Sequence, residues 1–210
     1  MARVFFFVDG FNLYHALDFF AGAKDHHRYR KYKWTSLTSL ARCYLTDKRD
    51  TIAGIEYFTT LATWDQHKVA RHQDFIKAQI NEGVSVVYGE FKLRDKRCTL
   101  CKRIYQAHEE KQTDVNIAVR LLQLAFQNHY DKAIIISGDT DLLPAVRAVQ
   151  RTFPGKPIGV VIPIGKASED FKKQANFHYK MKEFHLSSSR LADPLILSDG
   201  TVLHCPATWR

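Results

Sequence analysis

The stretch Ala133-Ile134-Ile135-Ile136-Ser137-Gly138-Asp139-Thr140-Asp141-Leu142-Leu143-Pro144 decides the fold. Its first four residues are apolar and mostly β-branched, which predicts a strand buried on both faces, and the Ser-Gly-Asp that follows ends it. A helix should come next, because Asp139 or Thr140 is a suitable N-cap and proline is tolerated in a first turn. Asp139 and Asp141 therefore lie at the carboxyl end of a central strand, where open α/β sheets bind ligands. The alternative is that both acids only cap the helix.

A second strand of the same kind opens the chain. Arg3 to Val8 is a continuous apolar run, and it ends in Asp9-Gly10-Phe11-Asn12. Asp9 thus occupies the same strand-exit position as Asp139. If the two strands are parallel neighbours, both acids reach one edge of the sheet.

Strands alternate with helices along the rest of the chain, which predicts an α/β fold with a mainly parallel sheet. One unit is expected over residues 1–186, with a basic insertion at 92–112 that carries Cys and His. A C-terminal extension should follow at 187–210, with a β-hairpin around Asp199-Gly200. Further strands are predicted at 52–61, 84–88 and 156–163, and helices at 12–20, 35–45, 65–82 and 113–126.

Charge and length narrow the class of protein. The 210 residues suit one compact unit, and the net charge of +9 predicts attraction to a polyanion, nucleic acid first. An anionic membrane is the weaker alternative, because no apolar run approaches the ~20 residues of a membrane span. The apolar amino terminus meets Asp9 too early for a signal peptide, so we expect a cytoplasmic chain with reduced cysteines.

The predicted helix at 113–126 supplies a third acid. Thr113 is a natural N-cap, and Asp114 then begins the apolar stripe that must face the sheet. Dipole complementation at the helix start is the alternative reading. Clustered carboxylates repel unless they are protonated or bridged by a cation, and oxygen ligands suit Mg²⁺ or Mn²⁺.

Three motifs occur in a fixed order: Val8-Asp9-Gly10-Phe11-Asn12, Lys111-Gln112-Thr113-Asp114-Val115 and Ser137-Gly138-Asp139-Thr140-Asp141-Leu142. Together they resemble the NYN branch of the PIN-like nucleases, in its bacterial LabA-like group, over residues 3–165. The resemblance implies a PIN-like three-layer α/β/α sandwich and a metal-dependent ribonuclease site. Asp9, Asp114, Asp139 and Asp141 match the acidic cluster of that family, Asn12 matches the polar residue of its first motif, and Glu110 is a further candidate.

A second group of metal-ligand types lies in the insertion. Cys98 and Cys101 have the spacing of a zinc-binding turn, and His108 follows as a third candidate ligand. His72, Cys43, His204 and Cys205 are the candidates for the fourth. Free thiols and redox chemistry are the alternatives to structural Zn²⁺.

Basic residues mixed with aromatics form two clusters that predict binding of single-stranded nucleic acid. The first contains Arg30, Lys31 and Lys33. The second, in the insertion, contains Lys96, Arg97 and Lys102. For either cluster alone, a solvated loop is the alternative.

The sequence therefore predicts a metal-dependent ribonuclease that hydrolyses phosphodiester bonds of single-stranded or structured RNA. The alternative is an RNA-binding or regulatory module that keeps the fold and the acids but cleaves weakly or not at all. A small-molecule phosphatase is disfavoured by the positive charge and the lack of a Gly-rich phosphate loop. No membrane partner is expected, and the oligomeric state stays open, a homodimer included.

Overall fold

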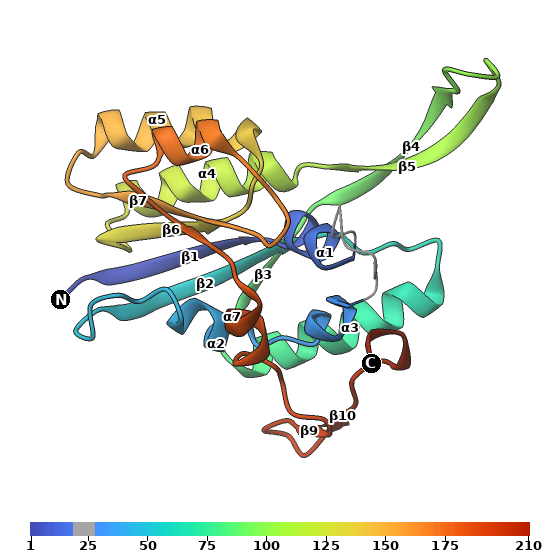
Figure 1. Ribbon diagram of the computed structural model, residues 1–210, viewed down its shortest axis with the longest axis horizontal. Helices are drawn as coiled ribbons and strands as arrows, with labels where there is room; N and C mark the ends of the chain where they lie inside the picture. Colours follow the sequence, from blue (N-terminus) through green and yellow to red (C-terminus); the bar gives the residue numbers. More distant parts are fainter. Residues whose placement is uncertain (19–27) are drawn as a thin grey trace.

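The computed structural model describes residues 1–18 and 28–210. Within them, six parallel strands form a central sheet in the order β3-β2-β1-β6-β7-β8 (Figure 1). The predicted α/β fold with a mainly parallel sheet is therefore confirmed. The strands of the sheet are β1 (Arg3–Asp9), β2 (Thr51–Thr59), β3 (Ser85–Tyr88), β6 (Lys132–Ile136), β7 (Ile158–Ile162) and β8 (Phe177–Lys180).

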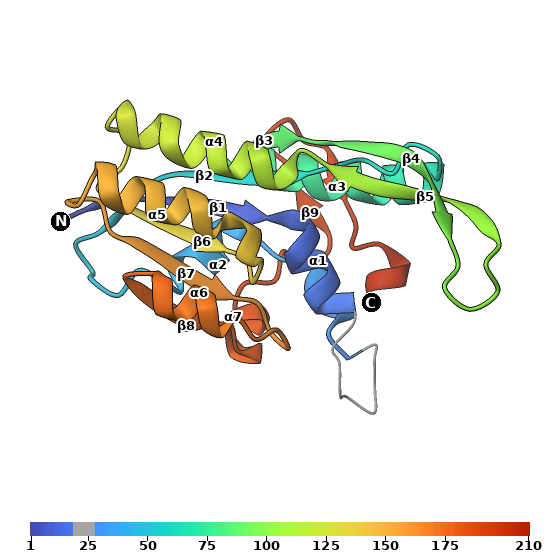
Figure 2. The same cartoon turned by 90° about the horizontal axis from the view of Figure 1, so that it is seen from above.

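Helices cover both faces of the sheet, which makes three layers (Figures 1 and 2). On the face with α1, α2 and α3, β1 buries Val4, Phe6 and Val8. On the face with α4, α5 and α6, it buries Phe5 and Phe7, because successive strand residues point to opposite sides. No helix in the described ranges is long and apolar enough to cross a bilayer. The helices are α1 (Gly10–Asp18), α2 (Leu37–Arg42), α3 (Gln66–Asn81), α4 (Thr113–Phe126), α5 (Leu143–Thr152), α6 (Glu169–Gln174) and α7 (Glu183–Ser187), with 3-10 turns η1 (Arg30–Lys33), η2 (Thr140–Leu142) and η3 (Ala207–Trp209).

The strand order reverses between β1 and β6. The chain runs outward from β1 through β2 to β3, then returns to place β6 against the free side of β1. In open α/β sheets, such a reversal leaves a crevice at the carboxyl ends of the two strands. Asp9 ends β1, and Ser137 follows β6 directly. The first and third motifs therefore lie at this crevice.

The basic insertion differs from its prediction. It forms a β-hairpin of β4 (Glu90–Arg97) and β5 (Ile104–Lys111) that projects from the body of the protein (Figure 1). A half-buried strand is recognised by alternating apolar and polar residues. This alternation is absent here, because both faces of the arm are largely exposed and carry charged residues. Strand β8 and helices α6 and α7 were also not predicted.

Two predicted helix starts need correction. Thr113 is the first residue of α4 and not its N-cap; that position belongs to Gln112, whose φ of 78° turns the chain from β5 into the helix. The amide of Thr113 donates to Glu110 Oε1 at 3.1 Å, and its hydroxyl donates to the same oxygen. Helix α1 begins at Gly10, earlier than predicted, and its predicted end at Phe20 lies outside the described residues.

The C-terminal extension packs against the α1–α3 side. Its predicted hairpin is present as β9 (Leu195–Ile196) and β10 (Val202–Leu203). The indole of Trp34 donates to the carbonyl of Ala192 at 2.9 Å. Leu203 and Trp209 are buried in the same cluster as the inner residues of β1, so the extension completes this half of the core.

Gln79 of α3 binds the backbone at the start of α2 and so fixes that segment to α3. Its side chain is 0% exposed, accepts from the amide of Leu37 at 2.9 Å and donates to the carbonyl of Thr35 at 3.0 Å. Both backbone groups would lack a partner without this amide, because Leu37 is the first residue of α2 and the β-bridge of Thr35 with Arg190 uses backbone groups of Trp34 and Ser36.

We expect Gln79→Leu to lower the free energy of unfolding by roughly 2–4 kcal/mol, since two buried backbone groups lose their hydrogen bonds. Urea denaturation measures the change. Gln73→Leu is the matched control, because Gln73 is an exposed residue of the same helix. Equal stability of the two variants would contradict the role given to Gln79.

Candidate active site at the carboxyl edge of the sheet

Asp9 joins β1 to both neighbouring elements of the edge. The residue is 3% exposed. Its Oδ1 accepts from the amide of Asn12 at 2.8 Å, and its Oδ2 accepts from the hydroxyl of Ser137 at 2.7 Å. Burial raises the pKa of Asp9 to about 6, although the hydrogen bonds from Asn12 and Ser137 act in the opposite direction.

The turn after β6 continues this network. The amide of Gly138 donates to Asn12 Oδ1 at 3.1 Å, and the amide of Asp139 donates to Ser137 Oγ at 3.0 Å. Asp139 in turn accepts from the amide of Asp141 at 3.0 Å, so it caps η2 as the sequence suggested. Capping and membership of the acidic edge are therefore compatible, because the cap uses only Oδ1 of this carboxylate.

Asp114 approaches the same edge from the first turn of α4. The pKa of its carboxyl is raised to about 6, first by burial and then by the charges of Asp9 and Asp139. Glu110 and Asp141 contribute to the same shift in smaller measure. These negative charges come from the ends of β1 and β6 and from β5. The three sequence motifs therefore meet in space.

A hollow of about 310 Å³ lies between these elements. Asp9, Asn12, Asp114 and Asp139 line it together, whereas Asp141 is exposed and lies outside the lining. The remaining lining residues are Phe11, Lys96, His108, Glu109, Glu110 and Thr113.

The side chains at this edge do not form a closed metal cage. Within residues 1–18 and 28–210, no group of three or more His, Cys, Asp or Glu side chains is arranged to hold a metal ion. Mg²⁺ needs no such cage, because it keeps several waters and is often bound through one or two carboxylates. Apart from His108 and the hydroxyl of Thr113, the metal-binding side chains of the hollow offer carboxylate and amide oxygens, the ligand types suited to Mg²⁺ and Mn²⁺.

The predicted zinc ligands meet only in part, because the side chains of Cys98 and Cys101 interact with each other but His108 lies apart from them. Cys98 and Cys101 lie in the turn at the tip of the hairpin, where the amide of Cys98 donates to the carbonyl of Arg103 at 2.9 Å. His108 pairs with Leu93 farther down the arm, and its ring stacks on Trp64 with 3.5 Å between the centroids. The antiparallel ladder thus separates the imidazole from the thiols, a register that the Cys spacing could not reveal.

The first basic cluster is mostly occupied within the protein. Lys33 is buried and lies 2.7 Å from Asp18, which also pairs with Arg30 at 2.9 Å. The Lys33 ammonium group is thus already paired within the protein, and its contact with nucleic acid stays a prediction. Lys31 is exposed, with its ammonium 5.1 Å from the centre of the Tyr32 ring.

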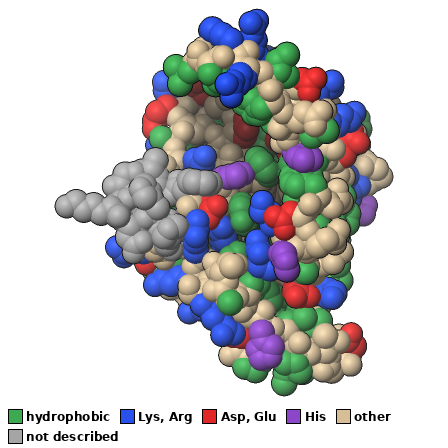
Figure 3. Space-filling view, turned by 90° about the vertical axis from the view of Figure 1, so that its right-hand side faces the viewer, with side chains coloured by type: hydrophobic (Ala, Val, Ile, Leu, Met, Phe, Trp, Pro, Cys, Tyr) green, Lys and Arg blue, Asp and Glu red, His purple; other side chains and the backbone are tan. Residues whose placement is uncertain are grey.

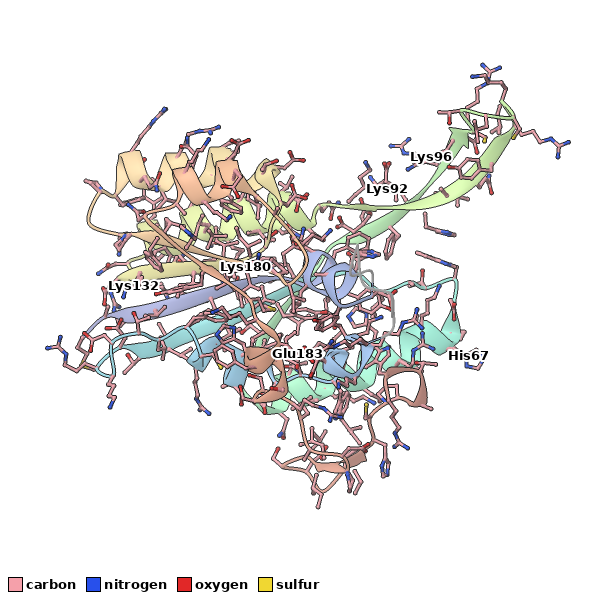
Figure 4. The ribbon with its side chains drawn as sticks, viewed as in Figure 1. His67, Lys92, Lys96, Lys132, Lys180 and Glu183 are labelled. Atoms are coloured by element: carbon pink, nitrogen blue, oxygen red, sulfur yellow. The ribbon has the colours of Figure 1, made fainter. Side chains whose placement is uncertain are left out.

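The second basic cluster lies along the hairpin arm. Lys96 extends from the hairpin arm (Figure 4). It lines the acidic hollow, although Glu109 lies 3.6 Å from its ammonium group. Arg97 and Lys102 are exposed at the tip, where each also donates to a backbone carbonyl. The arm thus carries cations from the hollow outward, which a linear reading of the insertion did not predict.

Lys166 is a further cation at the edge that the sequence reading missed. It follows β7 and is exposed, and its Cβ would lie 3.5 Å from a Cβ built on Gly138. The sequence could have indicated this position, because Ile164-Gly165-Lys166 follows the buried strand β7, the neighbour of β6.

Similar proteins agree with this architecture. The family model of the NYN domain matches residues 3–184. A protein of Pseudomonas putida named 6-hydroxy-3-succinoylpyridine 3-monooxygenase HspA is 26% identical over 231 residues, covering 90% of this chain and 69% of that protein. The crystal structure of a Vibrio parahaemolyticus protein of unknown function, VPA0982, is similar in fold, with a TM-score of 0.55 and 16% identity over 87% of this chain and 94% of that chain. Given a family match over most of its length, this chain belongs to the NYN domain family, whose fold is nuclease-like.

Proposed function

We propose that this protein is a divalent-metal-dependent ribonuclease that hydrolyses RNA phosphodiester bonds at the hollow lined by Asp9, Asp114 and Asp139. The observation that carries the proposal is the convergence of these acids from three elements. Asp9 and Asp139 lie close enough to Asp114 for the charge of each to raise its pKa. Carboxylates are seldom gathered at such cost unless a cation or a proton uses them.

Each acid has its own part in this proposal. Asp9 and Asp139 would hold Mg²⁺ or Mn²⁺, and Asp114 and Asp141 would contact it directly or orient the attacking water. A bound ion at this place lowers the pKa of water and offsets charge on the phosphate. Asn12 positions the Gly138 turn by accepting from its amide, and so keeps Asp139 beside Asp9.

Cations flank the acids on the side open to substrate. Lys96 lines the hollow, and Lys166 lies beside Gly138. Arg97 and Lys102 extend the positive charge along the hairpin. Together with the net charge of +9, this arrangement favours an extended polyanion over a small phosphorylated molecule.

We expect Asp139→Asn to lower the rate of RNA cleavage at least about 100-fold while RNA affinity stays equal or rises, because a negative charge facing phosphate is lost. Cleavage is measured with Mn²⁺ on single-stranded and structured RNA, and affinity with Ca²⁺ in its place. Asp74→Asn, a change at a half-buried residue on α3, is the control.

A wild-type protein that binds these strands and leaves all of them uncut would favour the regulatory RNA-binding module. A protein that neither binds nor cuts RNA would refute both functions.

A second prediction links pH to the cation. For Asp9 and Asp114, the folded pKa of about 6 exceeds the ordinary value of 3.8, so the folded protein holds protons that the unfolded chain has lost. Without a divalent ion, their contribution to stability is therefore complete below pH 3.8 and is lost as pH rises to about 6.

Near neutral pH, Asp114→Asn should raise the Tm in EDTA by roughly 3 °C, the shift that about 1 kcal/mol produces in a chain of this size. Added Mn²⁺ should raise the Tm of the wild type more than that of the variant. Calorimetry checks both. An equal Mn²⁺ response in the two proteins would remove Asp114 from the metal site.

The Pseudomonas putida relative favours a second candidate function, an oxygenase that acts on a small heteroaromatic substrate. Its name describes an enzyme of this kind, and an aromatic cavity of about 380 Å³ opens beside the acidic hollow. Incubation with 6-hydroxy-3-succinoylpyridine, oxygen and a reduced nicotinamide, followed by mass spectrometry, tests it. An unchanged substrate would exclude this reaction.

A further inference from the structure

A cavity of about 380 Å³ lies between α1, α3 and the carboxyl end of β2. Its walls are mostly apolar and aromatic, with Tyr14, Tyr57, Phe75 and Trp209 among the lining residues. Figure 3 looks onto this end of the molecule, where hydrophobic side chains are visible among Lys, Arg and His side chains. Ligand pockets for drug-sized molecules have volumes of this order, so the space suits one ring system.

Three polar atoms in the cavity wall lack a partner. Thr35 Oγ1, Thr60 Oγ1 and Arg71 Nε are buried and make no hydrogen bond within the described part of the chain. All three residues line the cavity, and Thr35 is only 2% exposed. Buried polar groups are almost always paired, so three unpaired ones on residues that line a single space point to a ligand that pairs with them once their side chains turn toward it.

The other polar groups of the wall are satisfied and largely neutral. His72 Nε2 lies 3.1 Å from Thr59 Oγ1 and 3.3 Å from the hydroxyl of Tyr57. Burial lowers the pKa of His72 to about 4, so the ring is neutral at physiological pH. The charge of Lys33 is offset by Asp18 at 2.7 Å. Arg71 therefore supplies the charged one of the three unpaired donors, which favours a neutral or anionic ligand with acceptor atoms.

An aromatic rim joins this cavity to the acidic hollow. Phe11 lines both spaces. Phe91 lies 6.4 Å from Phe11 and 4.7 Å from Trp64, measured between ring centroids. Trp64 in turn stacks on His108, which lines the hollow. A ring in the cavity and a phosphate in the hollow would therefore be close neighbours, separated by side chains that stack well on bases.

We propose that this cavity binds one planar heteroaromatic ring whose acceptor atoms pair with Arg71, Thr60 and Thr35. Resting on the proposed ribonuclease function, the ring is an unstacked base of the RNA strand held in the acidic hollow. The base packs against the aromatic wall, and its phosphate reaches the acids past Phe11. A free heteroaromatic molecule offers the same chemistry and is the other source that the experiment distinguishes.

Ring binding is tested first, without RNA. The four ribonucleoside 5′-monophosphates and nicotinate are titrated against the protein, and the fluorescence of Trp64 and Trp209 in the cavity wall reports binding. We expect saturable quenching by at least one probe, weakened about tenfold by Arg71→Met and by Thr60→Val, since each removes a hydrogen bond to the ring. Arg151→Met and Thr152→Val are the controls, because both residues are exposed on α5, across the sheet.

Ala62→Phe provides a second variant that fills the space without removing a polar group. It should abolish quenching while the Tm stays near that of the wild type. Wild-type protein that shows no saturable quenching with any probe overturns the proposal, as does quenching that the three cavity variants leave unchanged.

The source of the ring is tested with RNA that carries one abasic residue at successive positions. A base in the cavity predicts one position at which the abasic residue lowers affinity in Ca²⁺ about tenfold for the wild type and has no effect on Arg71→Met. If probes bind but no abasic position matters, the ring is a free molecule and the RNA base is refuted. If the wild type binds the base but cuts no RNA, the proposed hydrolysis fails and the ring site stands.

Discussion

The hydrogen bonds of the Asp9 carboxylate hold the whole edge together. One oxygen accepts from Asn12 at the start of α1, and the other accepts from Ser137 at the end of β6, so a single buried group fixes three elements at the point where the strand order reverses. Burial of this acid costs free energy, which is evident in its raised pKa. Under the proposed function, the same cost would favour a bound cation, because neutralising the charge relieves the penalty. Asp9 therefore both holds these elements together and is a proposed ligand of the cation.

Two unlike spaces meet at this edge. The hollow is lined by carboxylates and by cations such as Lys96, whereas the neighbouring cavity is lined by aromatic rings and a few unpaired polar atoms. Phe11, the second residue of α1, lines both spaces. A nucleotide has the same two halves, a charged phosphate and a flat, nearly neutral base. The match extends the argument for RNA beyond net charge, which alone would suit any polyanion.

The sequence predicted the sheet well, because buried strands leave local signals, and the hollow contains Asp9, Asp114 and Asp139 of the four expected acids but not Asp141. Buried strands such as β1 and β6 are continuous apolar runs, and the acids follow them directly. The sequence did not predict contacts that depend on distant partners. The pairing of Lys33 with Asp18 and the stacking of His108 on Trp64 are set by packing, and neither leaves a pattern in the sequence. The roles of Asp9, Asn12, Asp114, Asp139 and Asp141 stay proposals, and the LabA-like subgroup stays a prediction.

The order of the motifs along the chain has a consequence for synthesis on the ribosome. Asp9 emerges first, but its partner Ser137 and its neighbour Asp139 belong to the turn after β6, which is made much later. Until that strand docks beside β1, the first acid has no hydroxyl donor and the hollow has no second wall. A nascent chain therefore carries its aspartates apart, and whatever chemistry they perform begins only when nearly the whole sheet has been translated.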